Sequence, residues 1–169
     1  MLAHFVEIID GPLSFCRLGD ANNTWKERSE VVPRGRREDR QRLASFGQRD
    51  VVHRELLILR VGVRCAAPYE FGQHHVIAQR CDITVDEIER VKHGAEHHAW
   101  SPFDAALLRA ADELHDDSRI SDSTWAALAE RYSTEQMLDV IFTVGNYHLV
   151  SMALNSCGVE LDEGIPDTL

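Results

Sequence analysis

Lysine is scarce in this sequence, since Lys26 and Lys92 are the only two among its 169 residues. The net charge is −10, which argues against a nucleic-acid binder, because such proteins present a dominant basic face to phosphates. No apolar run approaches the roughly 20 residues that a membrane-spanning helix needs. We therefore expect neither a nucleic-acid partner nor a membrane.

The sequence also lacks a C-x-x-C pair. Its four cysteines are scattered along the chain, at Cys16, Cys65, Cys81 and Cys157. This spacing favours reduced thiols over a disulfide framework or a zinc site. The first 15 residues lack a basic stretch followed by a long apolar run, so we expect no secretory signal and a cytoplasmic location.

Residues 1–50 show no sustained hydrophobic period and are assigned to no fold. They include a basic cluster, diluted by Glu38 and Asp39. Its members are Arg34, Arg36, Arg37, Arg40 and Arg42. The cluster is either a contact for phosphate or for an acidic partner, or the solvated face of a short helix that ends at Phe46. We favour the solvated helix, because most charge runs have no further role.

From Val52 onward the pattern is helical. The first helix is almost wholly apolar, which marks it as buried rather than superficial. Its apolar residues are Leu56, Leu57, Ile58, Leu59, Val61 and Val63. Pro68 ends this helix and suits the first position of the next one, which we expect to continue to Arg80.

Four further helices are predicted from their N-terminal caps, at Thr84, Ser101, Ser121 and Ser133. Thr84 and Ser133 each open a capping box, with Glu87 and Gln136 at the third helical position. The last helix is expected to end at Gly158. The prediction is an all-α protein with one helical domain at residues 51–165.

Glu70 and His74 lie one turn apart at the start of the second helix, and thus on one face of it. The positive end of the helix dipole favours an ionised Glu70. His74 could be held protonated by Glu70 or Glu55, which makes it a candidate general acid. Burial would raise the pKa of Glu55 unless His74 or an arginine pairs with it.

The ordered segments RELLILRV and YEFGQHHVIAQR, followed by the capping box at Thr84, resemble the carboxymuconolactone decarboxylase-like family of the alkylhydroperoxidase D-like superfamily. The resemblance covers roughly residues 52–165. It implies an all-helical bundle that assembles into homotrimers or homohexamers, with a pocket for a small-molecule substrate near the start of the central helix.

Redox members of that superfamily carry C-x-x-C, with a histidine four residues later and a glutamate fifteen residues before the second cysteine. By this count His74 and Glu55 match, whereas Ala67 and Glu70 occupy the cysteine positions. Dithiol chemistry needs two thiols close enough to form a disulfide, so a peroxidase-like antioxidant activity is disfavoured. The decarboxylase branch resembles this sequence in its glutamate four residues before the histidine.

The resemblance thus implies a decarboxylase-like enzyme acting on a small lactone or related carboxylate, with no metal and no organic cofactor. The candidate catalytic residues are Glu55, Glu70 and His74, and the candidate substrate-binding residues are Tyr69, Tyr147 and His148. The alternative is a non-catalytic binding or scaffold protein. In that case Glu55 and His74 form a buried pair, and Tyr147 and His148 on the last helix only pack in the core.

Three further histidines, His93, His97 and His98, suggest a metal cluster by their spacing. Gly94 interrupts any helix between them, so a solvated loop is the favoured interpretation.

Overall fold

A computed structural model describes residues 37–167 and 169, with side chains described from Val51 onward. The chain divides into two units, Met1–Phe46 and Gly47–Leu169, the second holding five complete helices and part of a sixth.

The side chains of the predicted arginine cluster lie outside the described residues. The prediction that a short helix ends at Phe46 is wrong, because α3 runs unbroken over Arg37–Arg64. Gly47 is tolerated inside it, since a helical glycine costs only about 1 kcal/mol.

Six helices make up the described residues, which contain no strand. After α3 they are α4 (Pro68–Arg80), α5 (Val85–Lys92), α6 (Pro102–Asp117), α7 (Asp122–Ala129) and α8 (Thr134–Cys157). The prediction of an all-α fold is confirmed.

The predicted caps are present. Thr84 and Ser133 form reciprocal capping boxes with Glu87 and Gln136. Ser101 and Ser121 each accept a hydrogen bond from a backbone N–H of the first turn, that of Asp104 and that of Thr124. Gly158 ends α8 in the left-handed region, at φ +61°. These short-range signals fix the helix boundaries that place the site.

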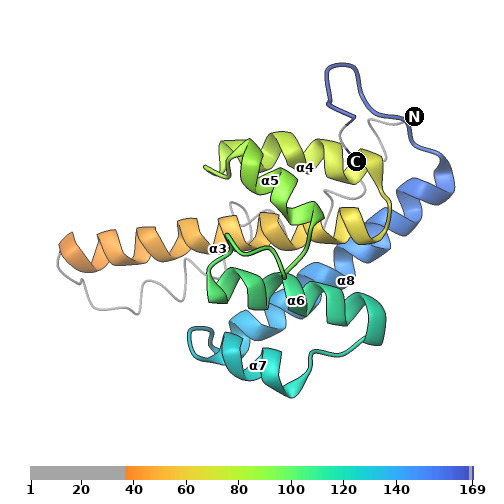
Figure 1. Ribbon diagram of the computed structural model, residues 1–169. Helices are drawn as coiled ribbons and strands as arrows, with labels where there is room; N and C mark the ends of the chain where they lie inside the picture. The colour runs from red at the N-terminus through yellow and green to blue at the C-terminus, as the bar shows by residue number, and fades with distance from the viewer. Residues whose placement is uncertain (1–36, 168) are drawn as a thin grey trace. The chain divides into compact units, whose positions relative to one another are not determined.

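The core surrounds the C-terminal half of α3, whose predicted apolar residues Leu56 to Leu59 and Val61 are all buried. In the unit Gly47–Leu169, α4 and α5 lie on one side of α3, and α6 and α7 lie on the other (Figure 1). Helix α8 packs against α4, α6 and α7. A Cβ at Gly62 would lie 3.3 Å from the Cβ of Phe71, so the glycine lets α4 approach α3 closely. This approach brings the polar residues of the two helices within reach of each other.

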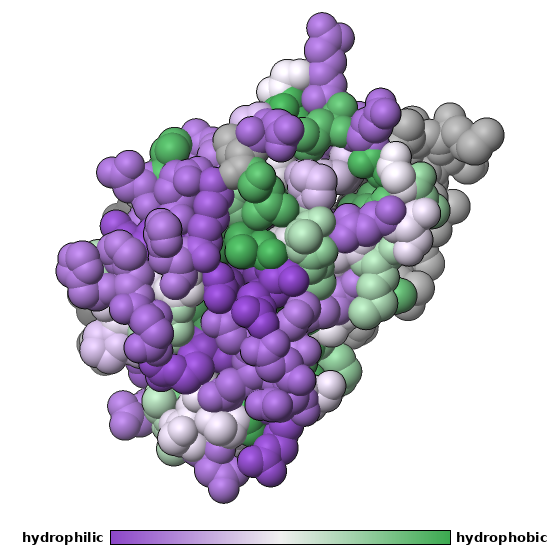
Figure 2. Space-filling view, turned by 45° about the vertical axis from the view of Figure 1, so that its right-hand side comes forward, coloured by the Kyte–Doolittle hydropathy of each residue, from purple (hydrophilic) through white to green (hydrophobic). Residues whose placement is uncertain are grey.

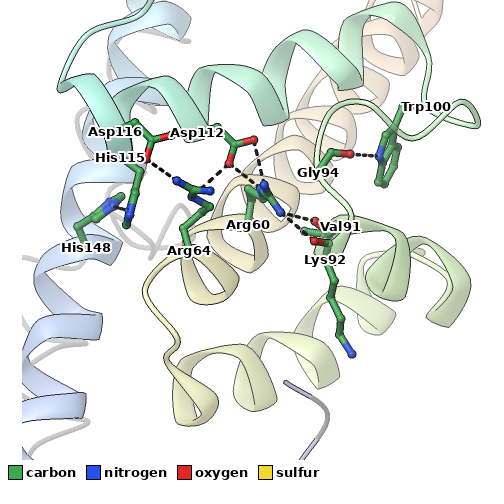
Figure 3. A network of polar contacts seen from close by, with 10 residues as sticks. All are labelled: Arg60, Arg64, Val91, Lys92, Gly94, Trp100, Asp112, His115, Asp116 and His148. Carbon is green, nitrogen blue, oxygen red and sulfur yellow. Dashed lines mark hydrogen bonds and ion pairs between the residues drawn. The ribbon is translucent and has the colours of Figure 1, made fainter.

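Arg60 is a charged residue inside the apolar run of α3, and it joins three helices (Figure 3). Its Nε and Nη2 donate to the two carboxylate oxygens of Asp112 on α6, at 2.7 and 3.0 Å. Its Nη1 donates to the backbone carbonyls of Val91 and Lys92 at the end of α5, at 3.0 and 3.1 Å. The guanidinium is thereby satisfied although only 7% of the residue is exposed.

The segment after α8 returns to the start of α4. A Cβ at Gly72 would lie 2.7 Å from a methyl carbon of Ile165 and 2.8 Å from one of Leu161, so the segment packs directly on the helix there. Asp162 accepts hydrogen bonds from the Tyr69 hydroxyl and the Gln73 amide, at 3.0 and 2.8 Å. The C-terminal segment therefore covers part of the first two turns of α4.

Helix α8 carries an exposed apolar stripe, although the face of the molecule in Figure 2 is mostly hydrophilic. The stripe consists of Leu138, Phe142, Leu149 and Met152. By length and composition α8 could cross a membrane, and it alone among the described helices meets that test. Its other face contributes Val144, Ser151 and Leu154 to the core of the bundle.

Candidate active site at the start of α4

Glu55, His74 and Glu70 lie together where α3 passes the first turns of α4. His74 Nδ1 lies 2.6 Å from Glu55 Oε2, and His74 Nε2 lies 3.1 Å from Glu70 Oε1. Each imidazole nitrogen therefore faces a carboxylate, one from each helix. Because a neutral imidazole has only one N–H, the two contacts together favour the imidazolium form, which donates at both nitrogens.

All three residues are removed from solvent. The exposed fraction is 0% for Glu55, 4% for Glu70 and 9% for His74. Buried ionised groups need partners, and here each carboxylate has the imidazole ring. Glu55 has a further partner in Arg54, whose Nη2 donates to Glu55 Oε1 at 3.0 Å. Arg54 was not among the predicted site residues, although its position beside Glu55 was a visible signal.

The pKa of His74 is raised from 6.5 to about 9. Burial acts in the opposite direction, since it disfavours the charged ring, but the hydrogen bonds and charges of Glu55 and Glu70 outweigh it. At neutral pH His74 is therefore a bound imidazolium.

The pKa of Glu55 is lowered, although burial alone would raise it. The hydrogen bond and charge of His74 and the charge of Arg54 reverse the effect of burial. The condition stated from the sequence, a histidine or an arginine paired with Glu55, is met by both residues. Glu55 is thus the fixed negative charge that holds the ring of His74.

The predicted substrate-binding residues lie in different surroundings. The Tyr147 ring packs edge-on against the His74 ring, with centroids 5.1 Å apart. Tyr69 is buried, with its hydroxyl on Asp162 of the C-terminal segment. His148 is turned toward α6, where its Nε2 lies 2.7 Å from His115 Nδ1. Only Tyr147 among the three thus contacts the imidazole directly.

A hollow of about 270 Å³ lies elsewhere, between the start of α6 and the end of α7. Its lining residues are Ser101, Pro102, Phe103, Ala127, Glu130 and Arg131. None of the predicted site residues lines it.

The described cysteines are free thiols at Cys65, Cys81 and Cys157. Burial raises the pKa of the Cys65 and Cys81 thiols, which makes them weaker nucleophiles at neutral pH. At the two positions where redox members of the superfamily that the sequence resembles carry cysteine, this chain has Ala67 and Glu70. The loop histidines His93, His97 and His98 have stacked or tilted rings but do not form a three-donor cluster in the described part of the chain.

No protein-family model and no curated protein matches this sequence. The fold is similar to a crystal structure of a protein of unknown function from Agrobacterium tumefaciens, for which a role as the antioxidant defence protein AhpD has been suggested. The match has a TM-score of 0.61 at 13% identity and covers 70% of this chain and 88% of the other. The alkylhydroperoxidase D-like fold predicted from the sequence is thereby confirmed.

Proposed function

We propose that this protein is an acid–base enzyme in which Glu55, His74 and Glu70 form a proton relay for a small carbonyl or carboxylate substrate. The observation that carries the proposal is the imidazole of His74 held between two buried carboxylates, at 2.6 and 3.1 Å. Glu55 fixes the ring, while Glu70, in the first turn of α4, is the relay's carboxylate on the substrate side.

The reaction class proposed is decarboxylation of a small lactone acid. Loss of CO₂ leaves an electron pair that delocalises onto a conjugated carbonyl, and a donor at that oxygen stabilises the enolate. Return of a proton to carbon then completes the reaction. An imidazolium with a pKa of about 9 is a suitable proton donor for either step, and Glu70 can carry the proton between the ring and the substrate.

A second candidate is a binding or scaffold protein without catalysis. It is favoured by the closure of the site, because both ring nitrogens of His74 already have partners and all three residues are buried. In that case the triad would only fix the packing of α4 on α3.

The test compares His74→Asn and Glu70→Gln with wild type, using turnover or ligand affinity on a panel of small lactone carboxylates. If the triad moves protons, His74→Asn abolishes activity in protein that remains folded, because asparagine donates a hydrogen bond but cannot exchange a proton at neutral pH. Glu70→Gln should also lower activity, but the loss should be smaller at acidic pH than at neutral pH. At acidic pH the one remaining carboxylate is enough to keep His74 protonated.

The matched control is His98→Asn, since His98 lies on the exposed loop after α5. It should leave turnover and melting temperature unchanged. Activity that falls only in proportion to the folded fraction, as measured by thermal melting of the same preparations, would establish the scaffold role instead.

We also propose that the protein is a cytoplasmic homotrimer or homohexamer. The exposed stripe on α8 supports assembly, since Leu138, Phe142, Leu149 and Met152 follow the spacing of a helix–helix seam, with Gly145 completing the series. Light scattering at micromolar concentration should give the mass of an oligomer. A monomeric mass would contradict the assembly without affecting the proton relay.

A further inference from the structure

A second cluster of chemically capable side chains lies outside the proton relay. It brings together Cys65 just after α3, His115 on α6 and His148 on α8. One donor atom of each residue lies within 4.8 Å of the other two. All three side chains are half-buried, so the cluster is reachable from solvent.

The hydrogen bonds of His148 fix which of its nitrogens is available. Its Nδ1 lies 2.8 Å from the Val144 carbonyl, which can only accept, so Nδ1 carries the proton and donates. The lone pair of the neutral ring is then on Nε2, directed at His115 Nδ1 (Figure 3). A backbone carbonyl that holds the far N–H of a histidine is the usual support of a metal-bound imidazole.

Ser151 gives an independent observation on the same face of α8, one turn after His148. The residue is 0% exposed, and its hydroxyl makes no hydrogen bond to an oxygen or nitrogen in the described part of the chain. Burial raises the pKa of the Cys65 thiol beside it, and a hydrogen bond from Ser151 acts in the opposite direction. The sulfur is thus the acceptor for this hydroxyl, and a charged thiolate accepts a hydrogen bond more strongly than a neutral thiol. A metal-bound thiolate is an acceptor for this hydroxyl.

Backbone contacts hold the cysteine in place. The Asn155 amide donates to the carbonyls of Cys65 and Ala66, at 3.0 and 3.3 Å. Arg64, the cation next to the cluster, is paired with Asp112 and Asp116 on α6. The positive charge of Arg64 is therefore offset by two carboxylates and opposes a bound cation only weakly.

We propose that Cys65, His115 and His148 form a site for a divalent transition-metal ion of intermediate softness, such as Zn²⁺. One thiolate and two imidazoles are the donor types that such ions prefer. In a tetrahedral zinc site the donor atoms lie roughly 3.3–3.7 Å apart. The two ring nitrogens, now 2.7 Å apart, would separate by about 0.6 Å, and the thiol would move toward them. The fourth position remains for water or a small anion.

This site was not predicted from the sequence, where neither a metal nor a cofactor was expected. Its ligands are separated by 50 and 33 residues in the chain, so no short motif reveals them. None of the hydrogen bonds among the described residues joins its ligands to Glu55, His74 or Glu70, although the charge of Glu70 acts on the Cys65 thiol.

The test is a Co²⁺ titration of the full chain, produced without a polyhistidine tag and stripped with a chelator beforehand. We expect one Co²⁺ per chain, with the thiolate-to-cobalt charge-transfer absorption in the near ultraviolet, and displacement of this absorption by Zn²⁺. Zn²⁺ should also raise the melting temperature of the stripped protein, because a ligand that binds only the folded state stabilises it.

Cys65→Ser should abolish the charge-transfer absorption, and His115→Gln should weaken Co²⁺ affinity at least tenfold while the thiolate signal remains at saturation. The matched controls are Cys157→Ser, which removes an exposed thiol, and His97→Asn, which removes a loop imidazole. Both should bind like wild type. Circular dichroism checks that each variant is folded. If His115→Gln fails to fold, His148→Gln replaces it as the test of an imidazole ligand.

The proposal is overturned if the wild-type chain shows no thiolate absorption with Co²⁺ at micromolar concentration. It is also overturned if the absorption survives Cys65→Ser, or if Co²⁺ affinity is the same in His115→Gln as in wild type.

Discussion

Two buried charged networks lie on the same helix, α3, and they differ in whether they can change their charge. Around Glu55, a carboxylate holds the imidazole of His74, which in turn holds Glu70. Around Arg60, five residues later, a guanidinium binds the carboxylate of Asp112 and two backbone carbonyls. An arginine stays protonated at any pH at which the protein folds, whereas a histidine can release its proton.

The second network therefore serves packing alone, because every donor it uses is permanently charged. It joins α3 to α5 and α6. The first network joins α3 to α4, and its histidine can lose its charge, with a pKa of about 9. Burial of charge is common to both regions, and so burial alone does not mark a catalytic site.

The largest expected effect comes from breaking the arginine network. Arg60→Met should reduce the free energy of unfolding by about 3–5 kcal/mol, because it removes the buried donor of two carbonyls and the closer of the two cations that pair with Asp112. Denaturant unfolding measures the loss. The matched control is Arg109→Met, whose ion pair with Glu96 is exposed and should change stability by less than about 0.5 kcal/mol. Equal losses in the two variants would show that Arg60 is no more important than a surface charge.

A smaller effect should follow from titrating the relay. His74 has a folded pKa of about 9 against 6.5 unfolded, so its stabilisation is complete below pH 6.5 and is lost as the pH rises through about 9. The shift corresponds to about 3 kcal/mol. Glu55 acts in the opposite sense, because its lowered pKa gives stability above 4.5 that is lost as the pH falls through the folded value.

Unfolding free energy measured from pH 5 to pH 10 should thus fall in wild type above pH 6.5 and fall less in His74→Asn. Arg60→Met should be less stable than wild type by a similar amount at each pH, since an arginine side chain keeps its charge across this range. A pH dependence that is the same in wild type and His74→Asn would contradict the assignment of the titration to His74.

The fold was predictable from the sequence because its signals are local. The caps at Thr84, Ser101, Ser121 and Ser133 and the stop at Gly158 each depend on residues within one turn of the helix end. The apolar run of α3 was recognisable as buried by composition alone. The unbroken course of α3 was not predicted, because Gly47 suggests an interruption that the helix does not make.

Pairings across the fold were only partly predictable. The spacing of Glu55 and His74 was recognised through the family resemblance, since no local rule joins residues 19 positions apart on two helices. Arg60 with Asp112, Tyr69 with Asp162, and His115 with His148 were missed. Each depends on how helices distant in sequence pack together, and periodicity carries no information about that packing.

The most direct test of the account is the protonation state of His74, measured by ¹⁵N NMR of the imidazole ring across pH 5 to 10. We expect a doubly protonated ring up to about pH 9, with the midpoint moving to lower pH in Glu70→Gln because one of the two carboxylates that favour the charged ring is removed. A midpoint at or below 6.5 in the wild-type protein would contradict the account, because burial would then outweigh both carboxylates and His74 would be a neutral core residue.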